Sequence, residues 1–250
     1  MSGHSHWATI KRKKSAGDAK RGQLFTKLAR EIAMAAREGG GDMDTNFRLR
    51  IAVEKARSNN MPKDSIERAI KRGTGESKDG FVFEQVIYEG YAPKGVALMI
   101  DCVTENRNRT VAEIRHILTR SGGSMGEAGS VGWQFTRKAY FSIPSKGNDF
   151  DKIFELAVEA GADDVNQDQD TIEITAPVES FKVILDALRQ AKIEPEEAEL
   201  RMIANQDMEL DVNDTLQVMK TIESLEELDD VQSVYSNLRI TEEAMAALES

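Results

Sequence analysis

The chain has 250 residues, of which 40% are hydrophobic and 30% charged, and its formal net charge is −10. This length predicts two or three domains, and no stretch approaches the roughly 20 apolar residues of a membrane span. The N-terminus has no apolar signal-peptide core, so we expect a cytoplasmic protein, and the single cysteine, Cys102, excludes an internal disulfide and a cysteine-rich zinc site.

Charge is distributed unevenly along the chain. Residues 1–78 contain 18 Lys and Arg but 9 Asp and Glu, a net charge of +9, whereas the remainder carries −19. This asymmetry predicts a basic module for a polyanion on an acidic body that repels stray phosphate. The alternative is that the basic helices are only a solvated surface of an acidic protein.

Residues 1–16 are predicted to form an arm that orders only on a partner. Aromatic and cationic side chains alternate there, a combination that suits stacking on bases and pairing with phosphates. The candidate nucleic-acid contacts in this arm are His4, His6, Trp7, Lys11, Arg12, Lys13 and Lys14. The alternative is a tail without function.

A first helix is predicted over about 18–38, ending at the three glycines 39–41. Leu24, Leu28 and Ile32 recur every four residues and predict its buried stripe. Four cations recur at spacings of seven, three and seven, which places them on one face. We expect this face, together with one neighbouring arginine, to contact the polyanion through Lys20, Arg21, Lys27, Arg30 and Arg37.

A second helix is expected to open near Asp44 or Thr45, which are favourable N-cap residues, and to end near Asn59. Phe47 and Ile51 are predicted to face inward, with Ala52 and Ala56 as further candidates for the buried side.

A third helix is expected from about Pro62, a favoured first-turn residue, to Gly73. Ile66 and Ile70 predict its buried side. Residues 73–80 have the composition of a linker.

After this linker the pattern changes to alternating strands and helices. Val96, Leu98, Ile100 and Cys102 alternate along one predicted strand, which is typical of a half-buried sheet. The predicted order is strand 82–91, turn 91–95, strand 96–103 and helix 107–120, then strand 133–143, helix 149–160, short strand 163–166, strand 170–175, helix 178–191 and strand 198–204, and finally helix 212–227 and strand 231–237.

The block from 133 to 204 has the order of a βαββαβ sandwich. The last helix and strand would complete the incomplete unit that begins at 82. The predicted fold class is therefore α+β with three domains: a basic arm and three-helix domain over 1–78, a discontinuous α/β domain over 79–129 plus 205–250, and a second α/β domain over 130–204 that is inserted in it. Both α/β domains are predicted to be of the ferredoxin-like βαββαβ type.

The polar run 104–110 lies between a predicted strand and a predicted helix. Arg107 and Arg109 stand at the start of that helix, where backbone N–H groups and guanidinium groups together favour an anion. The alternative is a capping loop whose arginines pair with the acidic body.

The sequence offers no catalytic constellation. The three glycines at 39–41 lack the Lys and Ser/Thr of a phosphate-binding loop and follow a helix. His4, His6 and His116 are too few for a zinc site without cysteines. We therefore expect a protein that is not an enzyme, with no metal, no cofactor and no small-molecule substrate.

Several ordered motifs resemble the YebC family. They are Gly3-His-Ser-His-Trp-Ala-Thr-Ile-Lys, Asp18-Ala-Lys-Arg-Gly, Phe25-Thr-Lys-Leu-Ala-Arg-Glu-Ile, Asn59-Asn-Met-Pro-Lys-Asp-Ser-Ile-Glu-Arg-Ala-Ile, Tyr88-Glu-Gly-Tyr-Ala-Pro-Lys-Gly, Thr104-Glu-Asn-Arg-Asn-Arg-Thr, Ser130-Val-Gly-Trp-Gln-Phe and Asp229-Asp-Val-Gln-Ser-Val-Tyr-Ser-Asn. They span nearly the whole chain. His6 departs from the family pattern, where a lysine is expected, and replaces a permanent charge with a titratable aromatic.

The resemblance implies three domains, a helical one and two α/β ones around a central cavity. It also implies a regulator: the family is described as DNA-binding transcriptional regulators, its mitochondrial relatives activate translation of a cytochrome oxidase subunit, and bacterial members are linked to ribosomes stalled on proline-rich chains. The partner implied is therefore a nucleic acid, either promoter DNA or ribosomal RNA. If it is ribosomal RNA, the ribosome is also a partner. A membrane is not expected as a partner.

The residues themselves favour contacts to phosphates and shape. The helices show no recognition helix with side chains spaced for base edges, and the basic residues are spread over an arm and several helix faces. We predict a nucleic-acid-binding regulator of gene expression. The rivals are a translation factor bound to ribosomal RNA and an acidic protein-interaction scaffold, which would keep its partner after loss of residues 1–16.

Overall fold

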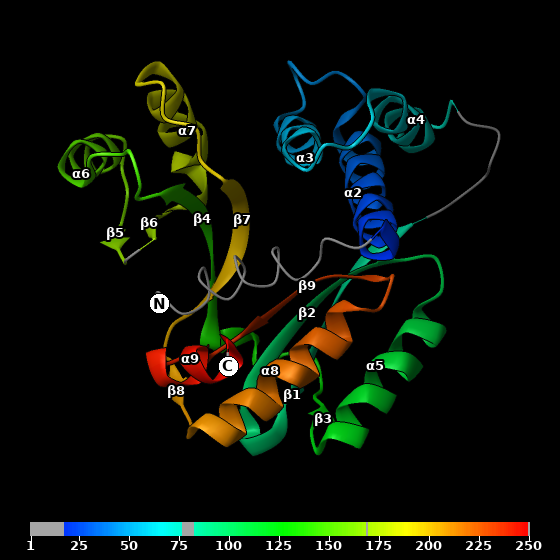
Figure 1. Cartoon of the computed structure of the whole chain (residues 1–250). Helices are drawn as coiled ribbons and strands as arrows, with labels where there is room; N and C mark the ends of the chain where they lie inside the picture. Colours follow the sequence, from blue (N-terminus) through cyan, green and yellow to red (C-terminus); the bar gives the residue numbers. More distant parts are fainter. Residues whose placement is uncertain (1–17, 77–82, 169, 250) are drawn as a thin grey trace. The chain divides into compact units, whose positions relative to one another are not determined.

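The computed structural model describes residues 18–76, 83–168 and 170–249. It divides into two compact units, one with residues 18–132 and 216–236, the other with 133–215 and 237–249. Figure 1 labels the elements of both. The architecture is α+β, with a helical region followed by two α/β regions, which confirms the predicted fold class. The limits of the three domains stay a prediction.

The helical region consists of α2 (Asp18–Gly39), α3 (Phe47–Ser58) and α4 (Lys63–Gly73). Its core joins Leu28 and Ile32 of α2 to Leu49 and Val53 of α3 and Ile66 of α4. The predicted stripe on α2 is confirmed for Leu28 and Ile32, which are 2% and 0% exposed, but not for Leu24, which is 38% exposed.

The start and the buried face of α3 differ from the prediction. The N-cap is Asn46, whose side chain accepts from Leu49 N at 3.0 Å and donates to the carbonyl of Ala35 at 2.7 Å. Phe47 and Ile51 are only half-buried. Ala52 and Ala56 are buried, as predicted, but Leu49 and Val53 complete the buried stripe in place of Phe47 and Ile51.

The first sheet has the order β3-β1-β2-β9 and is antiparallel. Its strands are β1 (Glu84–Tyr91), β2 (Ala97–Thr104), β3 (Ser124–Met125) and β9 (Val231–Ser236). The helical elements between them are η1 (Pro93–Gly95), α5 (Arg107–Ser121) and α8 (Val212–Glu226). Helices α5 and α8 lie on one side of the sheet (Figure 1). Val96, Leu98, Ile100 and Cys102 are all fully buried, as predicted. Ala97, Met99 and Val103 are buried as well, so the strand is covered on both faces and is not half-buried.

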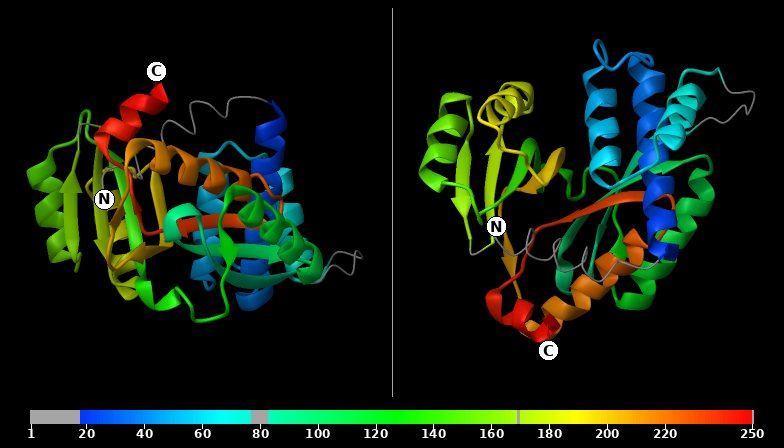
Figure 2. Two further views of the ribbon diagram at one scale, coloured as in Figure 1. Left: turned by 90° about the horizontal axis from the view of Figure 1, so that it is seen from below. Right: turned by 45° about the horizontal axis from the view of Figure 1, so that its top comes forward.

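The second sheet has the order β5-β6-β4-β7 and the predicted βαββαβ sequence of elements. These are η2 (Gly132–Gln134), β4 (Phe135–Pro144), α6 (Phe150–Glu159), β5 (Asp164–Gln167), β6 (Thr171–Ala176), η3 (Val178–Ser180), α7 (Phe181–Gln190) and β7 (Glu197–Ala204). A separate two-stranded sheet pairs β8 (Met208–Glu209) with β10 (Leu238–Arg239), and α9 (Glu242–Glu249) follows β10. Helices α6 and α7 lie side by side on one face (Figure 2), where Phe141 contacts Phe181. None of the helices in the described ranges is long and apolar enough to cross a membrane.

Candidate nucleic-acid interface

The predicted contacts of the N-terminal arm lie outside the described residues. They are His4, His6, Trp7, Lys11, Arg12, Lys13 and Lys14, and their role stays a prediction. Lys20 lies in the first turn of α2, but its side chain is also outside the description. The described candidates are therefore the remaining cations of α2 and the two arginines of α5.

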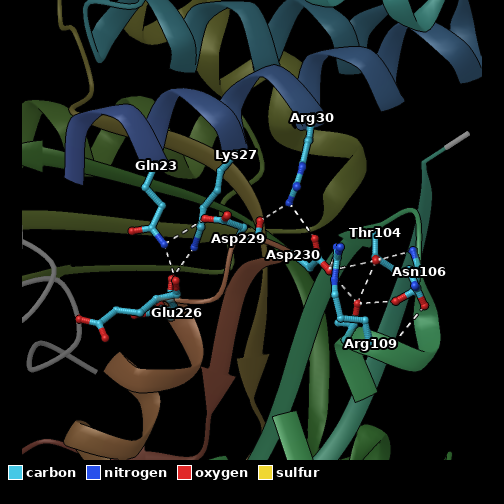
Figure 3. A network of polar contacts seen from close by, with 11 residues as sticks. Gln23, Lys27, Arg30, Thr104, Asn106, Arg109, Glu226, Asp229 and Asp230 are labelled. Carbon is cyan, nitrogen blue, oxygen red and sulfur yellow. Dashed lines mark hydrogen bonds and ion pairs between the residues drawn. The ribbon is translucent and has the colours of Figure 1, made fainter. Parts of the chain in front are cut away.

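The basic face of α2 points at the turn between α8 and β9 (Figure 3). Lys27 Nζ donates to the carbonyl of Glu226, and Arg30 donates to the carbonyl of Asp229 and, at 3.0 Å, to a carboxylate oxygen of Asp230. Gln23, one turn earlier, donates to the same turn. These cations share one face, as predicted, but in this structure that face binds the chain's own acidic turn.

Asp230 is the centre of this network. Its side chain is 3% exposed, and its second carboxylate oxygen accepts from Arg109 at 2.8 Å, Thr110 at 2.8 Å and Thr104 at 3.1 Å. Burial by itself raises the pKa of Asp230, but the hydrogen bonds from Arg109, Thr110 and Thr104 outweigh it and hold the pKa below its ordinary value. The Asp230 carboxylate is thus charged and accepts hydrogen bonds from side chains of both α2 and α5.

The run 104–110 adopts the capping arrangement that was the alternative interpretation. Asn106 is the N-cap of α5 and accepts from Arg109 N at 3.1 Å. Arg107 pairs with Glu84 at 2.7 Å, and Arg109 pairs with Asp230. Contact of these two arginines with nucleic acid stays a prediction.

The two remaining predicted cations of α2 are Arg37 and Arg21. Arg37, in the last turn of α2, donates to the carbonyl of Phe83 at 2.6 Å. Arg21, in the first turns, is exposed. Among the described candidates, the structure therefore brings together Lys27, Arg30 and Arg109 around one acidic turn. Arg37 and Arg107 have other partners.

A hollow of 610 Å³ opens between α2 and α4, and prediction from the sequence missed it. Phe25 and Ala29 of α2 and Met61 and Ala69 supply apolar lining. Its cations are Arg30, Arg68, Lys71 and Arg72, and its acidic residues are Glu76 and Glu105. The signal available was the basic last turn of α4, but the spacing of Arg68, Lys71 and Arg72 is also that of a solvated helix face.

A second hollow of 460 Å³ shares Arg72 and Phe83 with the first. It extends along α2 past Met34 and Arg37 to Gly40. Phe83 lies under the guanidinium of Arg30, 5.5 Å from ring centroid to guanidinium carbon. We call the two hollows together the α2/α4 groove. It follows α2 from Phe25 to Gly40, about 22 Å at about 1.5 Å per residue.

The side chains that line the groove offer binding chemistry. Within the described ranges, no three His, Cys, Asp or Glu side chains are grouped to hold a metal ion. Cationic side chains around an apolar, aromatic lining can hold an anion that carries an apolar or aromatic body.

Comparison with known proteins gives consistent matches along the chain. A family model for the N-terminal domain of TACO1/YebC proteins matches residues 5–76, and a model for the second and third TACO1/YebC domains matches residues 83–238.

Two relatives named probable transcriptional regulatory proteins match nearly from end to end. The one from Chlorobaculum parvum is 50% identical over 250 residues, covering 100% of this chain and 99% of its own. The one from Geotalea uraniireducens is 50% identical over 245 residues, covering 98% of each chain. The crystal structure of a conserved hypothetical protein from Aquifex aeolicus has a TM-score of 0.84 at 42% identity, covering 90% of this chain and 93% of that chain.

Proposed function

Because the chain belongs to the TACO1/YebC family, we propose that it is a regulator of gene expression that binds nucleic acid through its basic N-terminal region. The observation that carries this proposal is the α2/α4 groove, in which four cations surround an apolar lining within the basic part of the chain. The names of the relatives support the regulatory part and point to transcription as the process.

The exposed surfaces of the helices favour contacts to phosphates over reading of a duplex sequence. Side-chain amides, which pair with adenine edges in the major groove, are absent from α3 and α4. On α2, Gln23 donates to the acidic turn. The binding is therefore of low sequence specificity and strongly dependent on salt. The protein acts in the cytoplasm without chemistry of its own.

Promoter DNA is the target that the names of the relatives suggest. Ribosomal RNA is the second candidate, and the groove favours it because a hollow lined in part by aromatic side chains suits unpaired bases, which structured RNA displays.

The test is ultraviolet crosslinking in cells with sequencing of both DNA and RNA bound to the tagged chain, compared with a chain lacking residues 1–16. Crosslinks on promoters that depend on the N-terminal region support transcriptional regulation, and crosslinks on ribosomal RNA support the translation alternative. If neither nucleic acid is enriched over an untagged control, the proposal fails and an acidic scaffold takes its place.

A further inference from the structure

The α2/α4 groove combines three kinds of surface within one hollow. Phe25, which is half-buried, supplies an aromatic side chain to the lining, beside the buried Met61 and Ala69. Arg68 and Lys71, both exposed, extend along α4 at its border. A ligand that fits these surfaces has an aromatic or apolar body and repeated negative charges.

We propose that the α2/α4 groove binds one unpaired strand of RNA, with its phosphates on the cations of α4 and a base against Phe25. This inference rests on the proposed function and names its ligand. Positively charged grooves with aromatic side chains are how proteins hold single strands, because every base has a face that can stack and every nucleotide carries a phosphate.

The dimensions of the groove favour an unpaired strand over a duplex. The first hollow measures 610 Å³, within the roughly 300–1,000 Å³ of sites that take a small ligand. A base within a duplex stacks on its neighbours and cannot enter such a hollow without leaving the helix. A duplex lying across the groove would reach only the cations at its border.

Two carboxylates favour RNA over DNA. Glu76 and Glu105 line the same hollow and are exposed. An ionised carboxylate only accepts hydrogen bonds, and it repels phosphate. The 2′-hydroxyl of ribose is a donor that DNA lacks. A strand whose phosphates follow Arg68 and Lys71 can present its ribose hydroxyls to these carboxylates.

The first arm of the experiment tests the phosphate contacts. The full chain is titrated against a fluorescein-labelled single-stranded RNA of about 12 nucleotides, within the roughly 4–16-nucleotide range of single-strand sites. The double variant Arg68→Ala/Lys71→Ala is compared with Arg57→Ala/Lys63→Ala, which removes two exposed cations of the same helical region outside the groove.

The groove variant should bind roughly 10- to 30-fold more weakly. Its plot of log affinity against log salt should be shallower by about 1.4, since each phosphate contact on a single strand contributes about 0.7. The control variant should retain the affinity and salt dependence of the unchanged protein.

The second arm tests the stacking contact. Phe25→Leu keeps an apolar side chain against the core of the helical region, where Phe25 packs, but removes the aromatic face. Binding of the single strand should fall roughly 5- to 150-fold with the salt dependence unchanged. Thermal unfolding followed by circular dichroism checks that this variant is folded. If it is not, Phe25→Tyr, which retains the aromatic face, should bind like the unchanged protein.

Three results would overturn the inference while leaving the proposed function intact. They are equal weakening by the groove and control variants, equal affinity for blunt duplex RNA, and equal affinity for DNA of the same sequence. Glu76→Gln should reduce the ratio of the affinity for single-stranded RNA to the affinity for DNA of the same sequence. If the unchanged protein binds none of these nucleic acids, the proposed function itself fails.

Discussion

Replacing Asp230 by Asn tests the network that joins α2 to the first sheet. The substitution keeps the shape of the side chain but removes the charge that pairs with Arg30 and Arg109. Arg30 is 15% exposed, so its charge-assisted hydrogen bond contributes about 1.5–3 kcal/mol. Arg109 is 44% exposed and regains water, so its pair adds about 1 kcal/mol or less. The expected loss is about 3 kcal/mol.

The assay is hydrogen exchange of peptides from α2 and β9, read together with urea unfolding, because a chain of two units need not unfold in one step. A loss of about 3 kcal/mol corresponds to roughly 150-fold faster exchange through local opening. The matched control is Asp229→Asn, the same charge change at the next residue. Asp229 is exposed, so its substitution should change stability by no more than about 0.5 kcal/mol.

The difference between the unchanged protein and Asp230→Asn should also depend on pH. The pKa of Asp230 is lower in the folded state than its ordinary value. Its contribution is therefore complete above the unfolded pKa of about 3.9 and disappears as the pH falls through the folded pKa. If both variants exchange alike at pH 7, or if the difference between the unchanged protein and Asp230→Asn does not decrease as the pH falls below about 3.9, the charge on Asp230 does not hold α2 in place and the reasoning is refuted.

Three other sites give sharp expectations. Glu89→Gln should lower the stability of the 129–132 loop by about 1–3 kcal/mol, since the Glu89 carboxylate accepts hydrogen bonds from the N–H groups of three loop residues. Burial raises the pKa of Glu89, but these N–H donors outweigh burial and lower it. The difference in amide exchange of the loop between the unchanged protein and the variant should therefore decrease as the pH falls below about 4. Gly73→Ala should lower the free energy of unfolding in urea by about 2 kcal/mol or more, because the new Cβ would lie 2.2 Å from the carbonyl oxygen of Ala33. The control is Gly22→Ala, whose Cβ meets open space and which should stabilise α2 by about 0.5–1 kcal/mol. Cys102 is fully buried, and burial raises the pKa of its thiol, so a thiol reagent should label it only in denaturant, and rapid labelling of the native protein would contradict this burial.

Much of the fold followed from periodicity along the chain. The strand with Val96, Leu98, Ile100 and Cys102 was predictable because one face of a sheet recurs every two residues. The order of elements from 133 to 204 indicated a βαββαβ unit, and the sheet order β5-β6-β4-β7 follows from it. Such patterns are local, so the chain order alone carries them.

The buried face of α3 was not predictable in the same way. Two apolar stripes compete on this helix, one with the larger Phe47 and Ile51, the other with Leu49 and Val53 separated by alanines. The choice depends on how closely α2 approaches, which is a property of the packed helices. The cap at Asn46 likewise depends on its donation to the carbonyl of Ala35, eleven residues earlier.

The role of Asp230 has no local signal at all. Its partners Arg109 and Arg30 lie 121 and 200 residues earlier in the chain. Among 43 acidic residues, nothing in the order of the sequence marks Asp230 as one that is buried. Prediction therefore identified the cations of α2 but not the acidic turn that they bind.

This turn decides which cations a phosphate can reach at least cost. To bind Arg30, a phosphate must take it from the buried carboxylate of Asp230, which gives up a charge-assisted hydrogen bond of about 1.5–3 kcal/mol. One charge-assisted hydrogen bond to phosphate returns about 1.5–3 kcal/mol. On α4, Arg68 donates to neutral oxygens, the carbonyl of Asp64 and the hydroxyl of Ser65, and it is exposed. A phosphate can take over these contacts with little loss. A strand that enters the groove should thus bind α4 first, and Arg30 should contribute mainly by keeping α2, and with it the wall of the groove, against the first sheet.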